Sequence, residues 1–425
     1  MIKKAQQFFQ QRDFSRYVLI LSSGTVLAQL VPVLVSPILT RLYSPEDFAL
    51  LAFYLATANF FIVAATLRYE QAILLPKREK DAESLLALCI YIICAFSIFA
   101  YGLFYFCGRE IAEFLGNKDA SAWLMLIPAS IVITGIYRTM LNWANRQKHY
   151  KSMATVKVAQ TGSAATSNLI LGGLSAPGGL VIGELTGHII AASTLAIRTR
   201  KVIYRALQTP FTRVVANAKK YADFAKVNTP HVLMDTLQSS GLVFILASFF
   251  GDVVLGLYAL MMRVLMAPVS MIGTSVAQVF YKQASEVRNH GGDVSALMQS
   301  VTTKLALFSW PIFACFMFLA PDMFQFIFGE KWREAGEFAQ ILTPWVAVHF
   351  VVMPIMQLPM IFNEQRRAFL FGIVGNALML STIFFGGYIG DVKMGFVLLS
   401  FCMVIYFGAL YLWLKSVCDQ QWEVT

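Results

Sequence analysis

The sequence predicts an all-α polytopic membrane protein with about twelve transmembrane helices in two pseudo-symmetric six-helix bundles around a central cavity. Three observations favour this fold class: the apolar composition, the alternation of charge between successive loops, and an internal repeat. Of the 425 residues, 57% are hydrophobic and 14% are charged. A soluble globular chain has about 45–50% apolar and about 25% charged residues, so a soluble enzyme is excluded.

Twelve segments are long and apolar enough to cross a membrane as helices, which requires about 20 mostly apolar residues each. They are residues 17–40, 47–67, 83–107, 120–141, 153–173, 177–197, 228–250, 253–280, 300–320, 337–361, 367–388 and 393–414. Twelve helices of this length would use roughly 240 residues, which matches the apolar share of the composition.

Basic residues are distributed unevenly between the loops. The chain carries 34 Lys and Arg residues against 24 Asp and Glu, a net charge of +10. Most of the basic residues fall in every second loop, counted from the N-terminus. Because cytoplasmic loops favour Lys and Arg, this bias predicts that both termini are cytoplasmic, and it explains the charge without nucleic acid as a partner.

The longest loop, residues 198–227, separates an N-terminal bundle at residues 1–205 from a C-terminal bundle at residues 206–425. The loop is basic, with interspersed apolar residues such as Leu207 and Phe211. Two interpretations are open: an amphipathic helix on the membrane surface, or a solvated linker. The predicted outer loops are short and leave no room for an extramembrane catalytic domain.

Three short motifs recur in the same order in the two halves. Residues 42–52 pair with residues 249–259, residues 114–118 with residues 327–331, and residues 145–148 with residues 363–366. Each half holds an even number of predicted helices, so both halves enter the membrane in the same direction. Transporters with such a parallel repeat bind substrate between their halves and move the halves to alternate access.

One arginine lies deep in a predicted helix. Arg263 is about ten residues into the eighth segment, where a charge costs at least about 2.5–3.5 kcal/mol unless it faces a cavity or a partner. Its planar guanidinium suits a phosphate or diphosphate, so we expect an anion-binding group in the cavity. The alternative is a structural ion pair with a carboxylate such as Asp235.

Other titratable residues also lie inside the predicted helices. Glu184 and His188 are one helical turn apart in the sixth segment, and His231 and Asp235 are one turn apart in the seventh. Each pair is interpreted either as a site for a coupling proton or cation, or as a buried structural pair. His349, midway along the tenth segment, is either a proton relay or a hydrogen-bonded packing residue.

Polar residues near the cytoplasmic ends of the helices form a further group of candidates. Arg68 and Glu70 close the second segment, and Arg138 lies near the end of the fourth. They either contact substrate or are ordinary cytoplasmic-side charges. Asn59 and Gln29, inside the second and first segments, either contact sugar hydroxyls or form hydrogen bonds between helices.

Motifs of catalysis are absent from the sequence. There is no His-Glu-x-x-His, no phosphate-binding P-loop and no Gly-x-Ser-x-Gly. We therefore expect a transporter without catalytic residues, a metal site or a cofactor. Its energy would come from an ion gradient, the membrane potential or downhill use of the substrate.

Four blocks of sequence carry a resemblance to a known family. They are residues 39–48, residues 66–76, residues 250–260 with Arg263, and residues 328–336. Together and in this order they resemble the Wzx-type polysaccharide biosynthesis proteins. That family belongs to the multidrug/oligosaccharidyl-lipid/polysaccharide exporter superfamily, to which the MATE transporters and MurJ also belong.

The resemblance implies a flippase in the cell inner membrane, with two six-helix bundles facing a central cavity. Its substrate would be a polyprenyl-diphosphate-linked oligosaccharide repeat unit, such as that of O-antigen or another surface polysaccharide. Arg263 and Arg68 would contact the diphosphate, with Glu70 nearby. Partners would be the lipid bilayer, a polysaccharide polymerase and a chain-length regulator. The alternative is a cation-coupled multidrug exporter of the MATE type.

Overall fold

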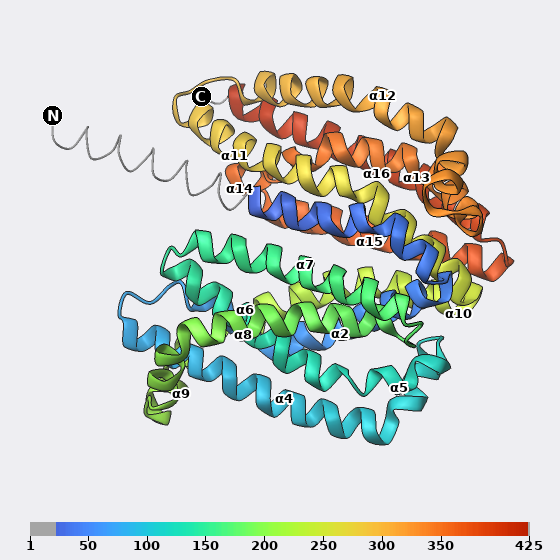
Figure 1. The fold of residues 1–425 in the computed structure, drawn as a ribbon. Coiled ribbons are helices and arrows are strands. Elements are labelled where there is room, and N and C mark those ends of the chain that lie inside the picture. The colour runs from blue at the N-terminus through green and yellow to red at the C-terminus, as the bar shows by residue number, and fades with distance from the viewer. Residues whose placement is uncertain (1–22, 424–425) are drawn as a thin grey trace. The chain divides into compact units, whose positions relative to one another are not determined.

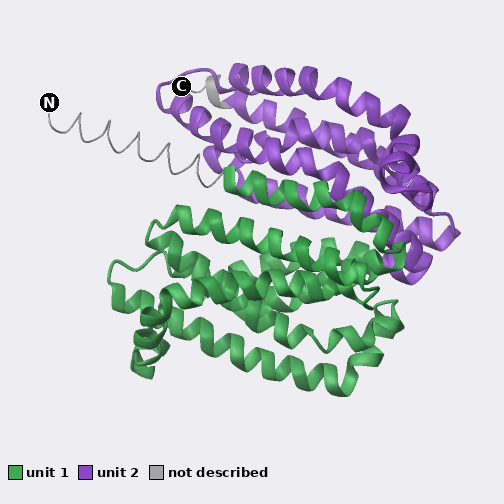
Figure 2. Cartoon of the chain, in the orientation of Figure 1, with its two compact units in different colours: residues 1–244 green, residues 245–425 purple. Residues whose placement is uncertain are grey.

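The computed structural model describes residues 23–423, and every regular element in that range is a helix. The predicted all-α polytopic membrane fold is confirmed. The start of the first predicted span and the basic N-terminal segment lie outside the described residues. The chain divides into two compact units, residues 1–244 and residues 245–425 (Figures 1 and 2). The predicted bundle boundary at residues 205/206 stays a prediction.

Unit 1 contains the first nine α-helices and the beginning of α10. Its elements are the helix Ser23–Leu42, α2 Pro45–Thr66, α3 Tyr69–Ala72, α4 Glu79–Phe114, η1 Lys118–Ala120, α5 Ser121–Leu124, α6 Ile127–Arg146, α7 Tyr150–Gly173, α8 Gly179–Leu207, α9 Phe211–Lys220 and the π-helix η2 Phe224–Asn228. Helices α7 and α8 approach closely at Gly187. A Cβ placed on this residue would lie only 2.6 Å from the Gln160 carbonyl oxygen. Small residues allow such close approach of membrane helices.

Unit 2 contains the remainder of α10 and the helices that follow it. Its elements are α10 Thr229–Pro268, η3 Val269–Gly273, α11 Thr274–Asn289, α12 Val294–Phe328, η4 Glu330–Trp332, α13 Arg333–Val352, η5 Met353–Ile355, α14 Leu358–Phe362, α15 Gln365–Ile389 and α16 Val392–Glu423. Helix α10 is broken at Gly251, whose φ of 79° and ψ of −175° are accessible almost only to glycine. Within the unit, α12 packs on α13, and α16 packs on both α13 and α15.

The number of spans differs from the predicted twelve. Among the described residues, nine helices are long and apolar enough to cross a membrane, or ten if the pair Lys118–Leu124 and Ile127–Arg146, bent by 53°, forms one span. The predicted seventh and eighth segments lie in the stretch Phe224–Asn289, which counts as one of the nine although it is broken at Gly251. The predicted fifth segment is helical, as α7, but Lys157 and Gln160 are among the polar residues that lower its hydropathy.

The first repeated turn begins with a helix cap. Ser44 caps α2, accepting from the Asp47 backbone N–H, while the Asp47 carboxylate accepts from the Ser44 N–H at 2.9 Å. Pro45 fits the first turn because the N–H it lacks would have no helical partner there. Burial raises the pKa of Tyr43 to about 12, so its phenol stays protonated and donates to the Asn168 carbonyl oxygen at 2.8 Å.

The second repeated motif has matching local geometry in the two halves. Gly116 has φ 95° and precedes η1, while Gly329 has φ 106° and precedes η4. In the third motif the residues with positive φ lie at different places. Lys148 follows α6 with φ 58° and pairs with Arg366 in the repeat, whereas Asn363 follows α14 with φ 60° and pairs with Asn145. The two halves therefore repeat in backbone conformation at the corners before η1 and η4.

The basic stretch after the sixth span is helical. Helix α8 continues to Leu207, and α9 follows as a strongly amphipathic helix that packs on α4 and buries Val214 and Asn217 (Figure 1). Asn217 donates to the Ser84 hydroxyl at 2.7 Å. Residues 198–227 therefore contain an amphipathic helix, as the first interpretation expects, and the place of this helix on a membrane surface stays a prediction.

Candidate functional site

A strained turn joins α2 to α3. Leu67 has φ 45° and ψ 27°, and Arg68 has φ 58° and ψ 10°. Two consecutive non-glycine residues in the left-handed region are uncommon, and each costs about 1–3 kcal/mol. Arg68 precedes Tyr69 and Glu70 follows it in the sequence. The turn brings the two charged side chains together, with 3.7 Å between Arg68 Nη1 and Glu70 Oε1. Strain of this size persists only where the surrounding structure holds it in place.

Arg68 and Glu70 form a buried ion pair with unsatisfied atoms. The Arg68 Nη1 and Glu70 Oε1 atoms lie 3.7 Å apart, and the two side chains are 19% and 3% exposed. Among the described residues, Arg68 Nε, Glu70 Oε2 and Thr66 Oγ1 are buried and have no hydrogen-bond partner. Each such atom costs about 1–3 kcal/mol. Unsatisfied polar atoms that gather in one place suggest a site that a ligand or water completes.

A second arginine belongs to the same group. Arg138 of α6 is half-buried and lies within electrostatic range of both Glu70 and Arg68. The three side chains, which we call the Arg68 cluster, carry two positive charges and one negative charge. A half-buried cluster with one surplus positive charge attracts an anion, and guanidinium groups match phosphate oxygens with two parallel hydrogen bonds.

Neighbouring residues hold α3 from two sides. The Tyr69 hydroxyl donates to the Ala218 carbonyl oxygen at 3.0 Å, and burial raises the pKa of this phenol. Arg146, at the end of α6, donates to the carbonyl oxygens of Ile73 at 3.0 Å and Pro76 at 2.6 Å. The Arg146 bonds satisfy carbonyl groups of the segment that follows α3, and the Tyr69 bond joins α3 to α9.

Asn59 lies apart from the Arg68 cluster. Its side chain is exposed on α2. Seven residues separate it from Thr66, which corresponds to roughly 10 Å along a helix at 1.5 Å per residue. The structure therefore does not bring Asn59 together with Arg68 and Glu70.

The Glu184–His188 pair belongs to a polar network across three helices of unit 1. His188 Nδ1 lies 3.8 Å from Glu184 Oε1, and His188 Nε2 lies 3.0 Å from Gln160 Nε2 of α7. The ring of Tyr137 on α6 meets the imidazole edge-on, with centroids 6.2 Å apart. The imidazole and carboxylate are 18% and 33% exposed, so this network has the groups and the partial burial that a proton site needs.

The second predicted pair is more open. His231 Nε2 and Asp235 Oδ2 lie 3.8 Å apart on α10, with side chains that are 54% and 59% exposed. Both residues belong to unit 1. Arg263 is half-buried on the part of α10 that belongs to unit 2. Asp235 pairs with its helical neighbour His231.

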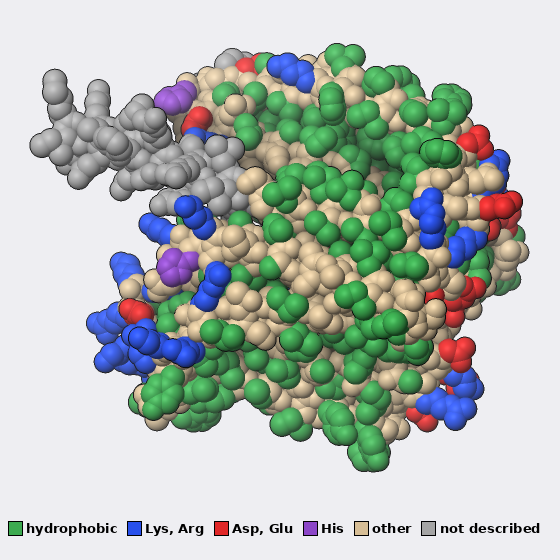
Figure 3. Space-filling model, in the orientation of Figure 1, with side chains coloured by type: hydrophobic (Ala, Val, Ile, Leu, Met, Phe, Trp, Pro, Cys, Tyr) green, Lys and Arg blue, Asp and Glu red, His purple; other side chains and the backbone are tan. Residues whose placement is uncertain are grey.

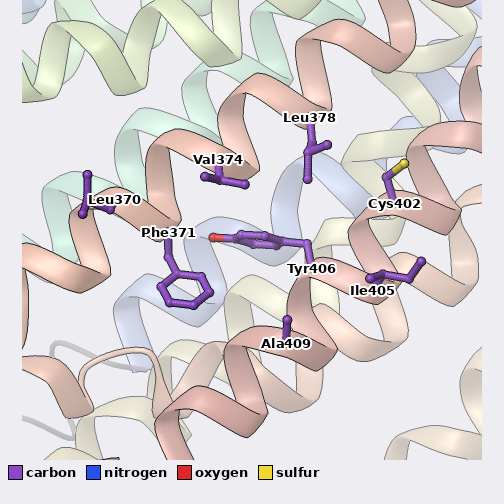
Figure 4. A pocket seen from close by; sticks show the side chains of 8 residues that line it. All are labelled: Leu370, Phe371, Val374, Leu378, Cys402, Ile405, Tyr406 and Ala409. Carbon is purple, nitrogen blue, oxygen red and sulfur yellow. The ribbon is translucent and has the colours of Figure 1, made fainter.

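Unit 2 contains candidates with a packing role. His349 stacks on Phe407 with ring centroids 5.0 Å apart, and its Nδ1 atom is buried without a partner among the described residues. A pocket of about 450 Å³ between α15 and α16 is lined by apolar side chains and by Tyr406 and Cys402 (Figure 4). It offers no charged group to a ligand.

Sequence reasoning missed two members of the Arg68 environment. Thr66 was not singled out, although it lies two residues before Arg68. Arg146 was noted only as part of a repeated motif, and its contact with residues 73–76 depends on the fold. The signal for Thr66 was its position in the same family-like block as Arg68 and Glu70.

Comparison with known proteins places the chain in a family. Residues 38–337 match the model of a family described as polysaccharide biosynthesis protein. The teichuronic acid biosynthesis protein TuaB of Bacillus subtilis (strain 168) is 19% identical over 272 residues, which are 63% of this chain and 54% of that protein. The chain therefore matches about half the length of this relative.

Solved structures share the fold at low identity. The lipid II flippase MurJ in an inward closed conformation has a TM-score of 0.72 at 15% identity, covering 93% of this chain and 86% of that chain. An inward-facing multidrug resistance MATE family transporter of the MOP superfamily has a TM-score of 0.66 at 10% identity, covering 91% and 96%. At these identities the likeness concerns the fold alone. The family match covers well over half of the sequence, and the chain belongs to this family of polysaccharide biosynthesis proteins.

Proposed function

We propose that this protein is a flippase that moves polyprenyl-diphosphate-linked oligosaccharide repeat units from the cytoplasmic to the outer leaflet of the inner membrane by alternating access. The family membership and the transporter fold support a role in moving a polysaccharide precursor. The observation that carries the proposal is the Arg68 cluster. It combines surplus positive charge with buried hydrogen-bonding atoms that have no partner.

Each residue of the cluster has a proposed role. Arg68 and Arg138 bind oxygens of the diphosphate, and Arg68 Nε gains the acceptor that it lacks. Glu70 Oε2 and the Thr66 hydroxyl accept hydrogen bonds from sugar hydroxyls next to the diphosphate. Because buried polar atoms that lack partners are costly, substrate that satisfies them is stabilised by their pairing. In unit 2, Arg263 is proposed as a further anion-binding residue.

The energy source is proposed to involve the Glu184–His188–Gln160 network. His188 and Glu184, whose Nδ1 and Oε1 atoms lie 3.8 Å apart and whose side chains are 18% and 33% exposed, would bind the coupling proton or cation between them. A membrane potential acting on the diphosphate is the competing source of energy. Transport that is driven by a pH gradient imposed on vesicles without a membrane potential would favour proton coupling over the potential.

Transport in vesicles tests the proposal. The full chain is reconstituted with a fluorescent short-chain polyprenyl-diphosphate-linked disaccharide, and the substrate that reaches the opposite leaflet is measured by quenching. We expect Arg68→Ala and Arg138→Ala to lower the initial rate at least tenfold. Arg78→Ala, which removes an exposed arginine ten residues away, is the matched control and should keep the rate.

Two outcomes contradict the proposal. Equal rates for Arg68→Ala and Arg78→Ala would remove the cluster from substrate binding. Equal transport of a polyprenyl alcohol that lacks the diphosphate would remove the diphosphate from recognition.

A second experiment tests the proposal in cells. Deletion of the gene should cause lipid-linked glycan to accumulate. A gene that encodes the Arg68→Ala variant should fail to reverse this accumulation, although the variant protein is present at a normal level.

A multidrug exporter is the second candidate function. The fold shared with MATE transporters favours it, as does the polar network around His188. The Arg68 cluster argues against it, because many drugs are cations and a surplus of buried positive charge repels them. Increased resistance of cells to cationic dyes on expression of this protein would favour the exporter.

A further inference from the structure

A groove opens between α4 and α9 in unit 1, away from the Arg68 cluster itself. Its volume is about 620 Å³. Apolar side chains of both helices line it, including Leu88 and Ile92 on α4 and Val214 on α9. Ala95 continues the same wall seven residues beyond Leu88, which is roughly 10 Å along a helix. The groove is therefore long and apolar on its α4 side.

The other side of the groove is basic. Lys219 and Lys226 line it, and both side chains are exposed. Neither lysine forms a salt bridge with any described residue. By contrast, the neighbouring Arg205 and Arg213 are paired: Arg205 Nε lies 3.0 Å from Glu83 and Arg213 Nε lies 3.6 Å from Asp81.

The basic side chains gather at one end of unit 1. In the view of Figure 3, Lys and Arg side chains cluster at the end of the unit where Figure 1 places α9. Two exposed aromatic side chains also line the groove: Tyr91 is 39% exposed and Phe211 is 70% exposed. Exposed aromatic rings beside lysines are typical of the boundary between hydrocarbon and headgroups.

We propose that this groove binds one anionic phospholipid. The headgroup phosphate lies between Lys219 and Lys226, and one acyl chain runs along Leu88, Ile92 and Ala95. Charge complementarity selects the headgroup, because the two unpaired lysines meet one phosphate. A basic residue near an anionic membrane surface contributes roughly fivefold to binding. The inference goes beyond the flippase proposal and does not depend on it.

The groove also reaches the support of the Arg68 cluster. Tyr69, which precedes Glu70, lines the inner end of the groove and donates its hydrogen bond to Ala218 of α9. A lipid that fills the groove therefore packs against the residue that anchors α3. Occupancy should reduce the hydrogen exchange of α3 amides, whose helix is a single turn.

Native mass spectrometry of the full chain in detergent tests the site. Phosphatidylglycerol and phosphatidylcholine of equal chain length are added at the same concentration. We expect one phosphatidylglycerol to be retained at least tenfold more than phosphatidylcholine. The double variant Lys219→Ala/Lys226→Ala should lose this preference. The matched control Lys201→Ala/Lys220→Ala removes two exposed lysines of the same region that do not line the groove, and it should keep the preference within twofold.

A second variant tests the apolar wall without changing charge. Ala95→Trp fills the far end of the groove from an exposed position and should lower phosphatidylglycerol retention at least fivefold. Glycerol phosphate, which has no acyl chains, should fail to displace the lipid at millimolar concentration. Elution volume and helical circular dichroism show whether each variant is folded, and Lys219→Arg/Lys226→Arg should bind as the unchanged chain does.

Four results would overturn the proposal. An equal loss in the two double-lysine variants would mean diffuse electrostatic attraction instead of a site. Equal retention of the two lipids would mean that no headgroup is selected. Complete displacement by glycerol phosphate, or full retention by Ala95→Trp, would mean that the acyl chain does not occupy the groove.

Discussion

The Glu70 carboxylate, 3% exposed, lies 3.7 Å from the Arg68 guanidinium, and its second oxygen has no hydrogen-bond partner among the described residues. This pair is loose for a buried ion pair. A contact of 3.7 Å with a free oxygen beside it leaves hydrogen-bonding capacity that a bound group could use. The predictions below test this pair, the turn that positions it and the packing around it.

Glu70→Ala should destabilise the protein, because it leaves Arg68 and Arg138 without their negative partner. We expect a loss of about 2 kcal/mol in unfolding free energy, less than for a fully buried pair, because Arg68 is partly exposed. In a double-mutant cycle with Arg68→Ala, the double variant should lose less unfolding free energy than the sum of the losses in the two single variants. Denaturant unfolding in detergent measures the unfolding free energy of the unchanged chain, the two single variants and the double variant. Strictly additive losses would contradict direct coupling between Arg68 and Glu70.

Leu67 tests the strained turn. With φ 45°, it occupies a region that a β-branched residue tolerates poorly and that asparagine tolerates well. Leu67→Val should therefore lower the melting temperature more than Leu67→Asn, although valine is the closer match in hydrophobicity. The opposite order would show that burial of the side chain, not backbone strain, decides the stability of this turn.

Arg146→Ala should loosen the segment between α3 and α4. The guanidinium donates to three carbonyl oxygens, of Ile73, Leu74 and Pro76. Hydrogen bonds to charged groups contribute about 1.5–3 kcal/mol, so we expect a loss in that range. Hydrogen exchange should increase over residues 71–78. Lys148→Ala, which removes an exposed basic side chain just beyond α6, serves as the control and should leave this exchange unchanged.

Gly187→Ala should force α7 and α8 apart. Its new Cβ would lie 2.6 Å from the Gln160 carbonyl oxygen and 2.8 Å from the Ala164 Cβ. Overpacking of this kind costs about 1–3 kcal/mol. Gly162→Ala on α7 has no neighbour within 4 Å of the new Cβ and should be neutral or slightly stabilising. Thermal unfolding that does not distinguish the two variants would contradict the close approach.

Arg263→Ala should abolish surface glycan in cells while the amount of protein in the membrane stays normal. The reason is the proposed anion-binding role of this guanidinium on α10. Lys282→Ala, whose parent side chain is 64% exposed and pairs with Glu286, is the control in the same unit. Wild-type glycan in the Arg263→Ala strain, measured by gel electrophoresis of surface polysaccharide, would remove Arg263 from the mechanism.

Much of the fold could be predicted because hydropathy and charge act locally. Long apolar runs such as residues 367–388 can only be stable as helices in lipid, where every backbone group needs an internal partner. The count of spans was less predictable. Helix α7 carries Lys157 and Gln160, and its polar side chains find partners such as Thr25 and His188 only in the folded unit.

The candidate site was only partly predictable. Arg68 and Glu70 are neighbours in sequence, so their pairing needed only a turn, and the sequence placed them correctly at the end of the second span. Arg138 joins them because α6 packs on α2 and α4, which no local pattern encodes. Asn59 is on the same helix as Thr66, yet a rise of roughly 10 Å along α2 separates it from the charges.

The paired corners at Gly116 and Gly329, each followed by a 3₁₀ turn, have a consequence for tolerance to substitution. Their φ angles of 95° and 106° are adopted by a residue with a Cβ only under strain. A Cβ on Gly329 would meet no neighbour within 4 Å, so at that corner the backbone alone, without any steric neighbour, would oppose every other amino acid.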